Sequence, residues 1–162
     1  MATFEWHGFD DYMKELDKLA KSTTGMVKRA VYQGAAVVAN EVRAHIEALP
    51  VTDRNPTKES KELLGVLEYE RDGLLEGLGL STMKDDNGFI YTAVGFDGYN
   101  RLTSEKYPKG HPNAMVARSI ESGSSMRKKH PFMRPALKAA QERAVEAMRV
   151  QMDMDIQSIV KE

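Results

Sequence analysis

The chain has 162 residues, a formal net charge of −1 and no cysteine. A chain of this length is the size of one domain with its own core, so we expect residues 1–162 to form a single domain. The missing cysteine excludes disulfides and thiolate zinc sites. The near-neutral charge disfavours a general nucleic-acid or membrane binder. We expect no signal peptide at the N-terminus, and no stretch reaches the ~20 apolar residues that span a bilayer.

The first part of the sequence predicts helices. Met13, Leu16 and Leu19 recur at intervals of three residues, which indicates a first short amphipathic helix. Residues 22–25 (STTG) predict a break after it. A longer apolar stripe then predicts a second helix over residues 26–49.

Two features of this region suggest how it packs. Gly34 and Ala35 are small, so a neighbouring backbone could approach the 26–49 helix closely there. Pro50 is expected to end that helix, because proline disfavours a helical residue before it. Residues 51–62 predict a flexible charged segment, and leucines at helical intervals predict a further helix over 58–76.

The periodicity then changes from helical to alternating. Two alternating runs flank Asn87 and Gly88, a dipeptide typical of a tight hairpin turn. They predict an antiparallel hairpin at about 78–96. A two-stranded hairpin is marginal on its own, so we expect a third strand from residues 3–9 or 130–134.

The C-terminal part predicts a loop and two helices. Residues 97–112 lack periodicity and indicate an extended surface loop. Asn113 could cap a short helix that Gly123 closes. A last helix is predicted over 135–158, with an apolar stripe that starts at Leu137.

These elements together predict an α+β fold. In it, a small antiparallel sheet centred on the 78–96 hairpin packs against the 26–49 and 135–158 helices on one face. The strands are too few for a doubly wound parallel sheet.

The search for catalytic chemistry finds no convincing constellation. The four histidines do not form the spacing that places two imidazoles on one helical face. The glycine-containing segments lack the frame of a phosphate-binding loop and the order of a dinucleotide-binding fingerprint. We therefore predict no catalytic residue, no metal and no cofactor, and we regard an enzyme as the least favoured class of function.

Charge is unevenly distributed along the chain. Residues 57–88 contain four Lys or Arg against eight Asp or Glu, a formal charge of −4, whereas residues 101–134 contain eight against two, a charge of +6. The basic loop at 127–130 (RKKH) could contact DNA. A solvated run of charge is the interpretation that we favour.

One segment is more specific than these patterns. Residues 117–125 (ARSIESGSS) are followed by a short basic spacer and by residues 131–137 (PFMRPAL) at the start of a helix. This segment resembles the signature of the neck and tail-completion proteins of tailed phages, also described as head–tail joining proteins. Residues 94–100 (VGFDGYN) match closely as well. The rest matches in the order of elements, and residues 51–76 are longer and more charged than in compact members.

The resemblance implies a mechanical role in a virion that is assembled in the bacterial cytoplasm. Such proteins form rings that join head-connector and tail proteins, so the expected partners are further copies and those components. Rings need heterologous interfaces, and the acidic 57–88 and basic 101–134 segments are candidates for the two patches. The interface candidates are Glu121, Gly123, Arg127, Lys128, Lys129, Phe132 and Arg134.

The motif also predicts local contacts. Pro131 and Pro135 restrict the backbone on either side of Phe132, which could anchor under the last helix of its own chain or in a neighbouring subunit. Glu121 and Arg134 are expected to pair, directly or across subunits. A DNA-contacting channel protein that uses the basic loop is the alternative function, and a small enzyme is the least favoured one.

Overall fold

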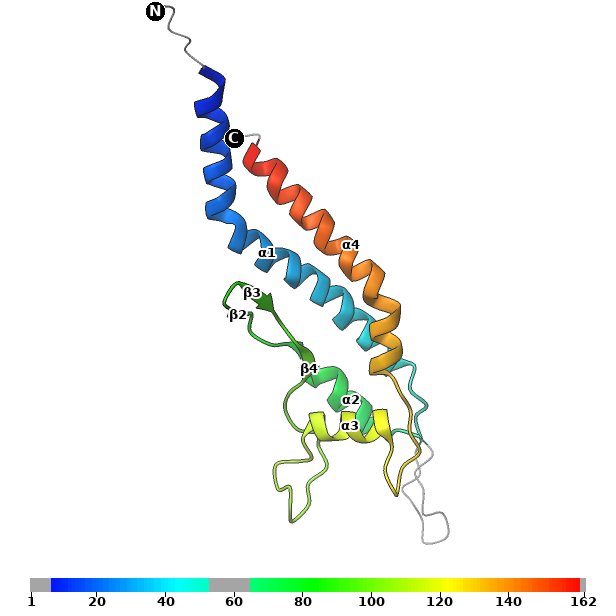
Figure 1. Ribbon diagram of the computed structural model, residues 1–162. Coiled ribbons are helices and arrows are strands. Elements are labelled where there is room, and N and C mark those ends of the chain that lie inside the picture. Colours follow the sequence, from blue (N-terminus) through cyan, green and yellow to red (C-terminus); the bar gives the residue numbers. More distant parts are fainter. Residues whose placement is uncertain (1–6, 53–64, 161–162) are drawn as a thin grey trace, which may run out of the picture.

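The computed structural model describes residues 7–52 and 65–160. Two long helices dominate it: α1 (His7–Glu47) and α4 (Met133–Val160). They run side by side in opposite directions, and the remaining elements gather along the part of the pair where α1 ends and α4 begins (Figure 1). The molecule is therefore an elongated helix pair with a smaller mixed α and β region beside one end.

The break predicted at residues 22–25 is wrong, because α1 continues through it. The hydroxyls of Ser22 and Thr23 donate to the carbonyl oxygen of Leu19 at 3.1 and 2.8 Å. Such bonds accommodate hydroxyl side chains within a helix and often bend it. Figure 1 shows that α1 changes direction in its blue first half.

Small residues line the seam between the two long helices. Ala136, Ala140 and Ala144 of α4 are buried. On α1, a Cβ added to Gly34 would lie only 2.7 Å from Cγ of Met148. The space over Gly34 is thus filled by the side chain of Met148 from α4, rather than by the neighbouring backbone that the sequence predicted there.

The helix predicted over 58–76 is shorter in the structure. It is α2 (Glu68–Gly77), and residues 58–64 lie outside the described part of the chain. Residues 65–67 are not helical. Val66 instead donates its N–H to the carbonyl of Pro50 at 2.8 Å, and this pairing draws the start of α2 to the end of α1. Of the charged segment 51–62, only residues 51 and 52 are described.

The predicted hairpin is confirmed. Four short strands form it: β1 (Leu78–Leu80), β2 (Lys84–Asp86), β3 (Phe89–Tyr91) and β4 (Val94–Phe96). β2 pairs with β3, and β1 pairs with β4, both antiparallel. Asn87 and Gly88 turn the chain with φ of 53° and 88°, as an Asn-Gly turn requires.

The prediction of a third strand is wrong within residues 7–52 and 65–160, the part of the chain that the structure describes. Each ladder there has two strands. Residues 7–9 belong to α1, and residues 133 and 134 belong to α4. The hairpin is instead supported by contacts with α1. The predicted α+β class is confirmed, because a small antiparallel sheet packs against helices.

The loop at 97–112 has no helix or strand, as predicted, but it is organised by a buried asparagine. The side-chain oxygen of Asn100 accepts the N–H groups of Leu102 and His111, both at 3.1 Å. Because these residues lie on opposite sides of the loop, Asn100 closes its base.

The short predicted helix is α3 (Asn113–Ser122), and Gly123 ends it with a φ of 76°. The capping role predicted for Asn113 is wrong. Pro112 occupies the cap position, and the buried amide of Asn113 donates to the carbonyl of Asp97 at 2.8 Å. The Asn113 side chain therefore links the start of α3 to Asp97, just after β4, and does not cap the backbone N–H groups of its own helix.

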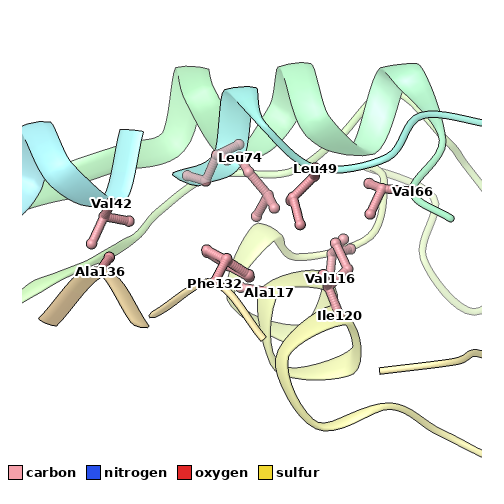
Figure 2. Packing of buried hydrophobic residues seen from close by; sticks show 10 residues of the cluster. Val42, Leu49, Val66, Leu74, Val116, Ala117, Ile120, Phe132 and Ala136 are labelled. Atoms are coloured by element: carbon pink, nitrogen blue, oxygen red, sulfur yellow. The ribbon is translucent and has the colours of Figure 1, made fainter. Parts of the chain in front are cut away.

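The core lies where the four helices meet. Phe132 is 1% exposed and packs at its centre, with its ring edge toward the ring of Phe96 at a centroid distance of 6.0 Å. Figure 2 shows the surrounding side chains, which come from the four helices, the turn after α1 and the segment before α2: Val42, Leu49, Val66, Leu74, Val116, Ala117, Ile120 and Ala136. Burying a phenylalanine of this kind contributes about 1.5–3 kcal/mol.

Candidate interface

Glu121 caps the N-terminus of α4 from the preceding helix. Its Oε2 accepts the backbone N–H groups of Phe132 and Met133 at 2.7 and 2.9 Å, and its Oε1 accepts that of Arg134 at 3.2 Å. N–H groups at a helix start have no acceptor within the helix, and a negative charge is favourable there. The glutamate of the 117–137 motif therefore fixes the geometry between α3 and α4.

The pairing predicted between Glu121 and Arg134 occurs within one chain. Arg134 Nε lies 3.8 Å from Glu121 Oε1. The Arg134 side chain is 87% exposed, so this ion pair contributes little to stability. The guanidinium remains accessible to a partner.

Of the two alternatives for Phe132, the structure contains the anchor under the last helix of its own chain. Phe132 immediately precedes α4, which starts at Met133, two residues before the predicted start. Pro135 falls in the first turn, where its missing N–H costs no helical hydrogen bond. Phe132 and Gly123 thus serve the α3–α4 connection, and the buried ring is not a surface group.

The basic loop is less exposed than its sequence suggests. Arg127 is 9% exposed, and its Nη2 lies 2.6 and 2.8 Å from the two carboxylate oxygens of Glu70. Glu70 Oε2 also accepts the N–H of Leu67 at 3.1 Å. Arg127 is therefore a structural residue that joins the loop to α2, and the expectation that it belongs to an exposed basic patch is corrected.

Lys128 and Lys129 do face solvent. The turn just before them is closed by paired backbone hydrogen bonds between Ser124 and Arg127, at 3.0 and 3.2 Å. After the lysines, His130 donates its N–H to the carbonyl of Ile120 at 2.8 Å. The two lysines thus lie between two anchored residues, Arg127 and His130.

The acidic and basic segments meet partly inside one chain. Glu70 pairs with Arg127, and Glu76 lies 3.5 Å from Arg101 in an exposed pair. Some of the complementary charge proposed for contacts between copies is therefore already used within a subunit. Lys128 and Lys129 form no ion pair within the described ranges, so their charges are available to a partner, as is that of the exposed Arg134.

Sequence reasoning missed an apolar groove beside the long helices. Its floor is the seam of α1 and α4, and its rim is the return strand of the hairpin. The hollow at its centre has a volume of about 310 Å³. We define the groove by six of its lining residues: Val31, Val38, Val94, Leu137, Val145 and Met148. The signal was available in part, because Leu137 and Val145 recur eight residues apart on α4.

Sequence reasoning also left the first turns of α1 without a role. Arg29 Nε lies 2.9 Å from Asp155 Oδ2, and α4 is described only five residues further, to Val160. Because the helices are antiparallel, the residues of α1 before about 24 extend past that point. We call residues 12–20 the arm.

Among residues 7–52 and 65–160, no group of three or more metal-ligating side chains is close enough to hold an ion. No helix in the same ranges is long and apolar enough to cross a membrane. Comparisons with protein-family models, curated proteins and solved structures gave no match.

Proposed function

We propose that this chain is a structural subunit of a tailed phage or a phage-derived particle, where it acts at the head–tail junction. In this role it forms a ring with further copies, and the ring joins or completes the tail by contacting head-connector and tail proteins. It is assembled in the bacterial cytoplasm and remains in the virion. The role is structural rather than catalytic.

The observation that carries the assembly proposal is the amount of exposed surface. The chain exposes 11697 Å², whereas a folded monomer of 18.2 kDa exposes about 8,100 Å². The expected surface rises if the twenty residues outside the described ranges are counted as fully unfolded chain and only the other 142 as folded. The observed surface still exceeds that expected value by about 1,000 Å². A standard protein interface covers about 800 Å² on each partner.

The choice of particle rests on the sequence resemblance, and the geometry of the motif supports it. Three matched residues at 117–137 position the last helix, because Glu121 caps α4, Gly123 ends α3, and Phe132 anchors their connection in the core. A motif that fixes the angle between two helices suits a subunit whose shape must match its neighbours in a ring.

Native mass spectrometry and electron microscopy of the purified full chain test this proposal. We expect a ring of defined copy number at high protein concentration, or on addition of a head-connector protein. A chain that stays monomeric under both conditions and with tail components contradicts the proposal.

Contact with DNA is a second candidate function, which the exposed Lys128 and Lys129 favour. Each neutralised phosphate contributes about −0.9 to the slope of log affinity against log salt concentration. A DNA-binding titration at several salt concentrations should then give a slope of about −2 or steeper. Binding that is absent at low salt excludes this candidate.

A further inference from the structure

We infer that the arm of one copy docks in the apolar groove of a second copy. This inference rests on the proposed function, because it names the contact through which copies join. It follows from two apolar surfaces that one chain leaves uncovered and cannot bring together by itself.

The arm presents apolar side chains to solvent. Met13 and Leu16 are 49% and 41% exposed, and Tyr12 beside them is exposed as well. Met13, Leu16 and Leu19 are spaced so that they lie along one face of the helix. In a single chain Met13 and Leu16 of this face stay exposed, whereas an amphipathic helix normally buries its apolar face.

The groove offers a matching apolar surface. Two adjoining hollows share Val38 and Leu137, and the second continues along α4 to Val145. Leu137 and Val145 are 46% and 61% exposed. Leu137 starts the apolar stripe predicted for the last helix, and its exposed side chain lines both hollows. An amphipathic helix commonly binds such a groove through anchors spaced by three and four residues.

The arm cannot fill the groove of its own chain. Leu16 precedes Val31 by 15 residues and Val38 by 22 residues on the same continuous helix. At 1.5 Å per residue, these separations are about 22 and 33 Å. Folding the arm back would require breaking α1, so an arm that fills this groove must come from another copy.

The surface excess also fits this contact. In a ring each chain contributes its arm to one neighbour and its groove to the other, so the excess of about 1,000 Å² per chain corresponds to about 1,000 Å² per interface, near the lower limit for a specific contact. Each copy has one arm and one groove at different places. Contacts of this heterologous kind link copies head to tail and close into a ring when the rotation between them allows.

Site-specific cross-linking tests the contact directly, because the chain has no cysteine of its own. Leu16→Cys, labelled with heavy nitrogen, is mixed with unlabelled Leu137→Cys and treated with a short bifunctional maleimide. We expect cross-linked dimers of mixed mass. Thr103→Cys, at an exposed loop position, is the control and should give few mixed dimers with either variant.

Charge substitution provides a second readout. Leu16→Glu and Val145→Glu should each raise the dissociation constant between copies about tenfold or more. Ala139→Glu places the same charge on an exposed position of α4 outside the groove, and its effect should stay below about twofold. Because Val145 is exposed, circular dichroism should show unchanged helix content.

The outcomes separate this inference from the proposed function. The arm-in-groove contact is wrong if copies assemble but the cross-links join only two Leu16→Cys chains or two Leu137→Cys chains. It is also wrong if Val145→Glu assembles like Ala139→Glu. In both cases the ring proposal stands. If the groove binds only a different protein, the contact between copies is also wrong. If the wild-type chain remains monomeric alone and with connector and tail components, both are overturned.

Discussion

Glu70 and Arg127 lie 57 positions apart in the sequence and form a buried ion pair between α2 and the loop that precedes α4. Both side chains are 9% exposed. Their contact is made from the acidic and the basic segments of the chain, and it anchors Arg127, the residue just before Lys128 and Lys129. The pair therefore links the internal architecture to the charged surface.

Removing one member of this pair should be costly. Arg127→Ala leaves the Glu70 carboxylate buried without its partner, and we expect a loss of about 3–5 kcal/mol in the free energy of unfolding, measured by urea denaturation. The double variant with Glu70→Ala should lose less than the sum of the single variants. As a control, Arg101→Ala in the exposed pair with Glu76 should cost less than about 1 kcal/mol. Equal losses at Arg127 and Arg101 would contradict the assignment.

Glu121→Ala should destabilise the start of α4, because three backbone N–H groups lose their acceptor. We expect a cost of about 1–2 kcal/mol. Hydrogen exchange measured by NMR should accelerate at the amides of Phe132 and Met133, but not near Ala144 in the middle of the helix. Glu121→Gln keeps one acceptor oxygen and should have a smaller effect. Unchanged exchange at Phe132 would show that the cap is not needed.

Two glycines of α1 should respond in opposite directions to alanine. Gly25→Ala places its Cβ in ordinary contact, 3.6 Å from Arg29 Nη1, and should stabilise the chain by about 0.5–1 kcal/mol through helix propensity. Gly34→Ala crowds Met148, and overpacking of this kind costs about 1–3 kcal/mol. Thermal unfolding distinguishes the two variants, and Met148→Ala should relieve the crowding. Equal stabilisation by both alanines would mean that the seam is loose.

Stability should decline at alkaline pH partly through Tyr69. Burial raises the pKa of its hydroxyl, the neighbouring Glu70 carboxylate raises it further, and Arg127 lowers it in part. The unfolded state therefore loses this proton first, so the contribution of Tyr69 is constant below about pH 10 and falls as the pH rises above it. Urea denaturation across this range should show a shallower decline for Tyr69→Phe. Tyr99→Phe, at an exposed tyrosine, is the control, and an equal change there would contradict the assignment.

The exposed lysines provide the test of charge in assembly. Lys128→Glu with Lys129→Glu should block ring formation without unfolding the chain, because complementary charge steers and orients association. The corresponding glutamine pair should give an intermediate effect, measured by native mass spectrometry. If the reversed pair assembles like the wild type, the charge-pairing idea fails.

The features predicted correctly from sequence are those that depend on neighbouring residues. Asn87 and Gly88 fix a turn through their own backbone preferences, and Gly123 ends a helix for the same reason. The break expected at residues 22–25 was wrong because serine and threonine hydroxyls can bond within a helix.

The remaining features depend on packing between distant segments, and no local rule contains that information. Arg127 belongs to a basic run in the sequence, and only the fold places Glu70 beside it. Ala140 and Ala144 of the apolar stripe predicted on the last helix are buried, but Leu137 at its start is exposed and Ala136 is buried in its place. For this reason the start of the core side of α4 and the role of Arg127 in the basic loop could not be derived from the sequence alone.

The continuity of α1 has a mechanical consequence. One hydrogen-bonded rod of 41 residues, about 60 Å long, connects the arm to Val42 and Ile46 in the core. A load applied at the tip would be transmitted along this rod to the packing around Phe132, with the bend in its first half as the compliant point. If the chain assembles as we propose, tension on the arm would therefore reach the centre of a subunit without passing through a loop.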